Sequence, residues 1–167
     1  TFWANNEFRH FDIKSLRFQS DRIKAITYDS TYNHVYLFKD RTRPFDRYSI
    51  EPDINGKFLI KSQEGWKSSI EADYAFVHFT LPVDHIRYGD LYILGEFSDW
   101  ELKEDFKLEY NDEQKQYEGS IYLKQGYYNY QYALSNNDAK ENINFIEGNH
   151  YQTRNDYYIY VYYRPFG

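Results

Sequence analysis

The feature that most constrains this chain is a period of two in its hydrophobic pattern. Between Tyr74 and Leu81, two sets of residues alternate. One set is apolar and includes Val77 and Phe79, and the other set includes Phe76 and His78. Successive side chains of a β-strand point to opposite faces, so this alternation predicts a strand with one face in a core. Further strands are expected at 23–28, 34–38, 57–61, 91–97, 106–110, 116–123, 127–134 and 157–163.

Turn-forming residues separate the expected strands at regular intervals. Asn111-Asp112-Glu113, Gln125-Gly126 and the run from Ser135 to Asp138 have the composition of tight connections. Short strands with such spacing predict an all-β, antiparallel sandwich. We place it at 67–167, with its strands between about 71 and 163. Residues 1–66 are predicted to form a strand-containing extension that either folds alone or adds strands to the sandwich.

The composition supports a packed core and excludes several kinds of site. Aromatic residues make up 22 % of the 167 residues, which is enough ring area for a core. The net charge of −6 argues against a nucleic-acid partner, which usually meets a basic face. The absence of Cys removes thiol nucleophiles, disulfides and Cys-ligated metals. No apolar run approaches the roughly 20 residues of a spanning helix. A chain with no Met is expected to be part of a longer protein.

The histidines and serines do not form a recognisable catalytic set. No two histidines have the i, i+4 spacing of a helical metal pair, and no serine lies in a nucleophile elbow. His78 is expected to be a packed or surface residue, since a metal site needs further ligands. No glycine-rich phosphate loop is present. We therefore expect no enzyme activity, no cofactor and no metal.

A carboxylate cluster between Glu96 and Asp105 keeps one enzymatic alternative open. Paired carboxylates can hydrolyse glycosides when a cleft holds them about 5–10 Å apart, and Glu96 and Asp99 would be that pair. Their place on a strand end and a polar loop favours a solvated surface instead. Asp53-Ile54-Asn55-Gly56 is interpreted as a turn, because it lacks the distal Glu of a calcium loop. A basic stretch, Arg41 to Arg47, lies in the extension.

A row of tyrosines near the end of the sequence predicts a recognition surface. If Ile159 and Val161 face the core, the opposite face of the same strand carries Tyr158, Tyr160, Tyr162 and Arg164. Tyr beside Arg is the composition of interface hot spots. The alternative is that this row packs beneath residues 1–66.

Two segments resemble the glycogen-binding module of AMP-activated kinase β-subunits and starch-branching enzymes. They are Gly95-Glu96-Phe97-Ser98-Asp99-Trp100 and the Tyr-rich run 117–132. The resemblance implies an early-set immunoglobulin-like sandwich and a sugar site with Trp100, Lys124 and Asn155. The second stacking Trp of that module is missing, since 134–137 reads Leu-Ser-Asn-Asn. A sugar site requires Trp100 to lie flat and exposed beside a groove, whereas a structural role requires it to be buried.

Five stretches in order resemble the type IX secretion system plug protein family of Bacteroidota: 11–18, 92–100, 124–132, 147–153 and 162–166. The resemblance implies a periplasmic, outer-membrane-associated protein without enzyme activity, preceded by a further immunoglobulin-like domain. Some members close the periplasmic mouth of the translocon. We therefore expect a binding protein whose partner is a component of the outer-membrane secretion machinery. The alternative is a carbohydrate-binding module centred on Trp100.

Overall fold

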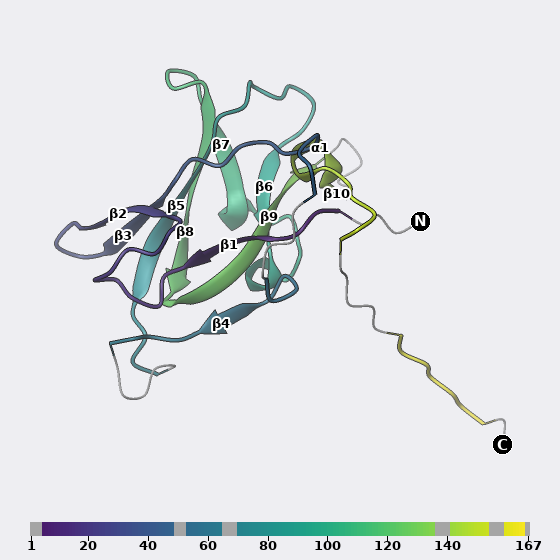
Figure 1. Ribbon diagram of the computed structural model, residues 1–167, viewed down its shortest axis with the longest axis horizontal. Helices are drawn as coiled ribbons and strands as arrows, with labels where there is room; N and C mark the ends of the chain where they lie inside the picture. The colour runs from purple at the N-terminus through teal and green to yellow at the C-terminus, as the bar shows by residue number, and fades with distance from the viewer. Residues whose placement is uncertain (1–4, 49–52, 65–69, 136–140, 154–158, 166–167) are drawn as a thin grey trace.

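The computed structural model describes residues 5–48, 53–64, 70–135, 141–153 and 159–165, and in these ranges the chain is almost entirely β (Figure 1). The strands are β1 (Arg9–Asp12), β2 (Ile23–Tyr28), β3 (Asn33–Leu37), β4 (Phe58–Ile60), β5 (Tyr74–Leu81), β6 (Leu91–Leu94), β7 (Lys107–Asn111), β8 (Gln116–Lys124), β9 (Gly126–Ser135) and β10 (Glu141–Asn142). One short helix, α1 (Asn144–Glu147), and two 3-10 turns, η1 (Glu96–Ser98) and η2 (Glu104–Phe106), complete the list. The predicted all-β class is confirmed.

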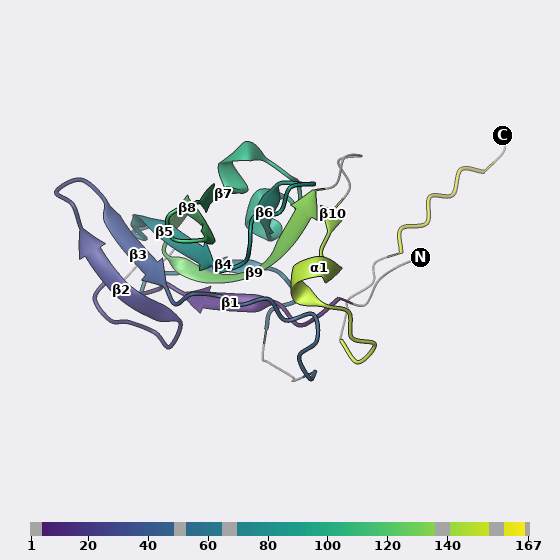
Figure 2. The same cartoon turned by 90° about the horizontal axis from the view of Figure 1, so that it is seen from above.

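The strands form one strongly curved, nearly closed sheet in the order β1-β9-β6-β7-β8-β5-β3-β2, with β4 and β10 also paired to β9 (Figure 2). The pairs are antiparallel except β3 with β5, which run parallel. The expectation of a purely antiparallel arrangement is wrong at this pair. The chain leaves β3, forms β4 against β9 and only then returns as β5, so β3 and β5 are joined by a crossover and not by a hairpin.

Strands from the first 66 residues share this sheet with the later ones. β1 and β4 pair with β9, and the β2–β3 hairpin adds to the edge of β5. The predicted boundary near Trp66 falls outside the described residues. Within the described ranges, no helix is long and apolar enough to cross a membrane.

The core lies between the wall made by β1 and β9 and the wall made by β5 and β8. Phe79 of β5 meets Phe11 of β1 edge-on, with ring centroids 5.6 Å apart, and Tyr130 of β9 at 5.3 Å. The predicted inner face of β5 is buried as expected. Three tyrosines of β9, Tyr128, Tyr130 and Tyr132, are at most 1 % exposed.

The structure differs from the sequence prediction in several segments, and β1 and β10 were not predicted at all. β6 ends at Leu94 and not at residue 97, because the Ser98 hydroxyl bonds both Gly95 N–H and Gly95 C=O and turns the chain. No helix was predicted between the last two expected strands, where α1 lies, because its single turn is too short for a helical period to be visible. The predicted last strand is absent from its described part, where Ile159 and Val161 are 88 % and 85 % exposed instead of facing the core.

Candidate functional site

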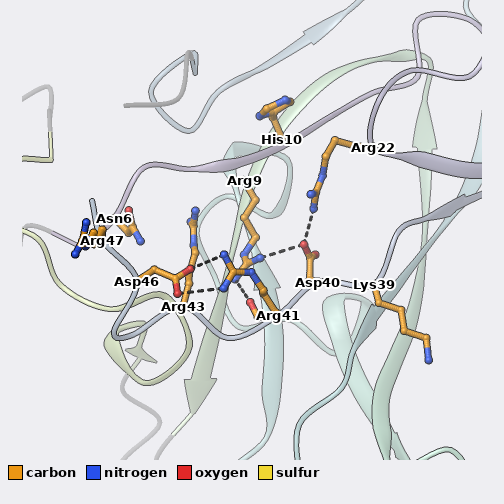
Figure 3. A pocket seen from close by; sticks show the side chains of 10 residues that line it. All are labelled: Asn6, Arg9, His10, Arg22, Lys39, Asp40, Arg41, Arg43, Asp46 and Arg47. Carbon is orange, nitrogen blue, oxygen red and sulfur yellow. Dashed lines mark hydrogen bonds and ion pairs between the residues drawn. The ribbon is translucent and has the colours of Figure 1, made fainter. Parts of the chain in front are cut away.

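A cavity of about 480 Å³ opens between β1 and the segment that follows β3 (Figure 3). Its described lining carries six cationic side chains and two carboxylates: Arg9, Arg22, Lys39, Arg41, Arg43, Arg47, Asp40 and Asp46. This concentration of positive charge contrasts with the net charge of −6 of the whole chain. We call this feature the cationic pocket.

Asp40 forms the floor of the cationic pocket and is only 4 % exposed. Its Oδ1 accepts from Arg9 Nη1 at 3.0 Å and from Arg22 Nη2 at 2.6 Å. Its Oδ2 accepts from the hydroxyls of Tyr130 at 2.6 Å and Tyr132 at 2.7 Å. Burial, and then the negative charge of Asp40, raise the pKa of both phenols well above the usual range. The two tyrosines therefore stay protonated and act as donors.

Glu147 is the second buried carboxylate and comes from α1 at the far end of the sequence. It accepts from Arg9 Nε at 2.9 and 3.1 Å, from Arg43 Nε at 2.6 Å and from the Tyr132 backbone N–H at 2.8 Å. Every oxygen of Asp40 and Glu147 thus has at least two donors. Such saturated carboxylates hold the segments together and leave no free base for acid–base chemistry.

The rim of the cationic pocket is less fully neutralised than its floor. Lys39 donates to the neutral Gln116 Oε1 at 2.7 Å, and Glu118, which accepts from the same Gln116 side chain, partly offsets its charge. Arg41 binds Asp46 with two contacts, Nη1 to Oδ1 at 3.1 Å and Nη2 to Oδ2 at 2.8 Å. Guanidinium groups in this geometry bind carboxylates and phosphates in pairs of bonds. The basic stretch 41–47 was visible in the sequence, but its contacts with Arg9 of β1 and with Glu147 were not.

A second feature is a continuous row of rings on the outer face of β3, β5 and β8, which we call the aromatic ladder. Its members, in spatial order, are Tyr36, His78, His34, Phe76, Tyr122 and Tyr74. Neighbouring centroids lie 4.3–5.6 Å apart. The alternation of β5 predicted its members Tyr74, Phe76 and His78 on one face, but the contributions of β3 and β8 depend on strand pairing.

Several neighbouring rings of the ladder are stacked, so they cover one another's faces. Tyr36 and His78 are stacked with an interplanar angle of 9°, and Tyr74 and Tyr122 with an angle of 21°. Sugar rings stack on free aromatic faces, so the interior of the ladder offers a pyranose little platform. His34 Nδ1 lies 2.9 Å from His78 Nε2, and His34 Nε2 lies 2.9 Å from Asp29 Oδ2. Burial and then His34 lower the pKa of His78.

No group of three or more potential metal-ligating His, Asp or Glu side chains occurs in the described part of the chain. In the ladder, the acidic residue that contacts the histidine pair is Asp29, which is hydrogen-bonded to His34. His10, on β1, stacks on Tyr127 with centroids 5.6 Å apart.

Trp100 has a partly covered ring, which is neither the flat exposed ring expected of a sugar site nor the buried ring expected of a structural residue. It is 37 % exposed, its centroid lies 5.6 Å from that of Phe8, and its Cη2 and Cζ2 atoms approach the position a Cβ would take on Gly56. It does not line the cationic pocket. Lys124 lies elsewhere, at the end of β8, with Nζ 5.8 Å from the centre of the Tyr74 ring. Trp100 thus contacts Phe8 and Gly56, whereas Lys124 lies beside Tyr74, and Asn155 lies outside the described residues.

The predicted tyrosine row is only partly described. Tyr158 lies outside the described residues, whereas Tyr160 and Tyr162 are 76 % and 93 % exposed, and Arg164 is exposed as well. The segment 159–165 runs away from the folded body in both views (Figures 1 and 2). The row is thus not packed beneath the first 66 residues in its described part.

The carboxylate cluster lies on an exposed loop that has a contact to β4 and a contact within the loop. Glu96 Oε2 accepts from the Phe58 backbone N–H at 3.1 Å, and Asp99 Oδ2 pairs with Lys103 Nζ at 2.5 Å. The Asp99 and Glu101 side chains are 76 % and 68 % exposed. Exposed carboxylates of this kind lack the apolar environment that gives a glycosidase its protonated acid.

The crystal structure of a hypothetical protein from Parabacteroides merdae ATCC 43184 is similar to this chain, with a TM-score of 0.87 and 37 % sequence identity. The match covers 91 % of this chain and 38 % of that one. No protein-family model matches the chain, and neither does any curated protein. The chain therefore spans little more than a third of the Parabacteroides protein and shares its fold over nearly all of its own length.

Proposed function

We propose that this chain is a non-catalytic binding module that docks on a protein partner through its Tyr-rich segment, residues 159–164. The observation that carries the proposal is that five consecutive apolar or aromatic residues, 159–163, are each 76–93 % exposed. Single exposed apolar residues are common, but a contiguous run marks an interaction site. The chain itself does not cover this run in the described residues.

The chemistry of the segment fits strand addition to the edge of a partner sheet. Alternating β-branched and aromatic residues favour extended backbone, whose N–H and C=O groups can pair with an open edge. The Tyr rings then supply contact area at a low entropic cost, and Arg164 adds a charged anchor. Backbone pairing would provide affinity, and the alternate side chains would provide specificity.

The partner that we propose is a component of the outer-membrane secretion translocon, with the module on its periplasmic side in a plug-like role. Support comes from the stretches that resemble the type IX plug family, among them 92–100, 124–132 and 162–166. We also propose that the curved sheet is an early-set immunoglobulin-like sandwich, which the Gly95–Trp100 motif and the Tyr-rich strand β9 support.

The test places a photo-crosslinking amino acid at position 160 of the full-length protein in its native cell. The expected result is a crosslink to an outer-membrane protein. The double variant Tyr160→Ser with Arg164→Ala should weaken binding to that purified protein by at least about 2 kcal/mol. Tyr122→Ser, on the aromatic ladder, is the matched control and should leave binding unchanged. Crosslinks confined to the same chain, or equal binding by the double variant, would refute the proposal.

The alternative is a carbohydrate-binding module centred on Trp100, and the 37 % exposure of that ring is the observation in its favour. One platform contributes on the order of 1–3 kcal/mol in comparable stacking sites, which is weak for a helical glucan. Glucan binding that disappears in Trp100→Ala while the protein stays folded would reverse the order of the two functions. Hydrolysis of a glycoside that is lost in both Glu96→Gln and Asp99→Asn would instead establish an enzyme.

A further inference from the structure

We propose that the cationic pocket is a binding site for a phosphate- or carboxylate-bearing ligand, and that the Asp46 carboxylate occupies the ligand's position at Arg41 in this structure. The proposal is independent of the function of residues 159–164. It assigns a ligand class to the cavity of about 480 Å³, a volume within the usual range of small-molecule sites.

The first argument is the charge of the site. Six cationic side chains line the pocket against Asp40 and Asp46, and Glu147 beneath them adds a third carboxylate. Glu118 also interacts with Lys39, so four carboxylates oppose the six cations and two positive charges remain in excess. Gathering like charges in one cavity opposes folding, so an excess beyond the structural ion pairs indicates an anionic occupant.

The second argument is that the Arg41 backbone is fixed by the buried network beneath it. Arg9 Nη2 donates to the Arg41 carbonyl at 2.7 Å, and the neighbouring Asp40 N–H donates to the Thr80 carbonyl at 2.9 Å. Two residues later, the Arg43 N–H donates to the Ile146 carbonyl at 2.8 Å. Binding sites need such supporting contacts to hold their donors in place. The segment that carries Arg41 is therefore preorganised by groups that are themselves neutralised.

The third argument is the geometry at Arg41 itself. Its side chain is 75 % exposed, so it contributes little to the core, yet its guanidinium binds Asp46 through two nitrogen–oxygen contacts. This is the arrangement by which guanidinium groups bind carboxylates and phosphates. Asp46 belongs to the same short segment and is itself partly exposed, so an external oxyanion can replace it without disturbing the floor of the pocket (Figure 3).

The test titrates inorganic phosphate and pyrophosphate into the folded protein and follows backbone amide shifts. Arg41→Gln should weaken binding at least about tenfold, whereas Asp46→Asn should tighten it several-fold because the competing carboxylate is gone. Arg17→Gln, the same change at an exposed arginine outside the pocket, is the control and should change the affinity less than about twofold. Loss of the Arg41 side chain should not unfold the protein, which the amide spectrum checks directly.

A second arm distinguishes a soluble ligand from a lipid headgroup, using vesicles of phosphatidylglycerol and of phosphatidylcholine. Binding to phosphatidylglycerol vesicles that Arg41→Gln abolishes would assign the site to an anionic headgroup, and phosphate binding without vesicle binding would assign it to a soluble oxyanion. The proposal fails if neither probe binds, if Arg41→Gln and Arg17→Gln behave alike, or if Asp46→Asn does not tighten phosphate binding.

Discussion

Arg9 and Glu147, which stand 138 positions apart in the sequence, form a buried ion pair in which Arg9 Nε lies 2.9 Å from Glu147 Oε1 and 3.1 Å from Oε2. Their side chains are 6 % and 1 % exposed. The pair joins the first strand of the sheet to α1, and through Arg43 it also fixes the segment after β3. The ion pair thus links three parts of the chain that are distant in the sequence.

Glu147→Gln should destabilise the protein by about 3–5 kcal/mol, because it leaves Arg9 and Arg43 buried without their shared counter-charge. Chemical denaturation measures the change in the free energy of unfolding. Glu101→Gln is the control, since that carboxylate is 68 % exposed and should change stability by less than about 0.5 kcal/mol. Equal effects of the two substitutions would show that the buried pair does not stabilise the fold.

Tyr132→Phe should cost about 1.5–3 kcal/mol, the usual range for a hydrogen bond to a charged group. The substitution keeps the buried ring and removes only the donor that lies 2.7 Å from Asp40 Oδ2. Tyr122→Phe, on the half-exposed aromatic ladder, is the matched control and should be nearly neutral. Thermal or urea unfolding of the unmodified protein and the two variants measures the change in the free energy of unfolding. A neutral Tyr132→Phe would mean that Asp40 is satisfied by its other donors.

Gly56→Ala should destabilise by about 2–4 kcal/mol, from its positive φ and from a steric clash. The backbone φ at Gly56 is +77°, and an added Cβ would lie 2.6 Å from two carbon atoms of the Trp100 ring. In a Trp100→Ala background the steric part should be smaller, so the double-mutant cycle should give a coupling energy of about 0.5–3 kcal/mol. Strict additivity would show that Trp100 does not rest on Gly56.

Trp100→Ala alone should cost about 1–3 kcal/mol, less than the roughly 3–5 kcal/mol of a fully buried aromatic residue, because the ring is 37 % exposed. Urea unfolding monitored by circular dichroism measures this without relying on the fluorescence of the residue removed. A loss above about 4 kcal/mol would indicate that the ring supports more of the core than Phe8 and Gly56.

The stability of the fold should fall as the pH decreases through the usual pKa of histidine, about 6.5. The pKa of His78 is lowered in the folded state by burial and then by His34, so the unfolded chain takes up a proton first. Where the unfolded state binds more protons, stability rises with pH, and the loss on acidification stops once the pH is below the folded pKa. His78→Gln should flatten this part of the stability–pH curve. His85→Gln, which removes a histidine stacked on Tyr110 instead, is the control.

The sequence determined most of the strands, because the pleat of a strand imposes a period of two on local residues. It did not predict β1, nor that β6 and β9 are buried on both faces. The segments 74–81 and 23–28 form strands with the predicted bounds, and β5 buries the face predicted to lie in the core. The same local rule failed in 159–163, the described part of the predicted last strand, since alternation favours an extended backbone but a strand also needs a neighbouring edge to pair with.

Only the tertiary structure decided how those strands meet. The parallel pairing of β3 with β5 gathers His34, Tyr36 and His78 into one ladder, and the path of the chain around β9 brings Arg9, Asp40 and Glu147 together. The basic stretch 41–47 is visible in the sequence, yet it becomes one side of a pocket only through partners more than 30 positions away. Charge pairing and ring stacking depend on distance in space, which the local periodicity of a strand does not encode.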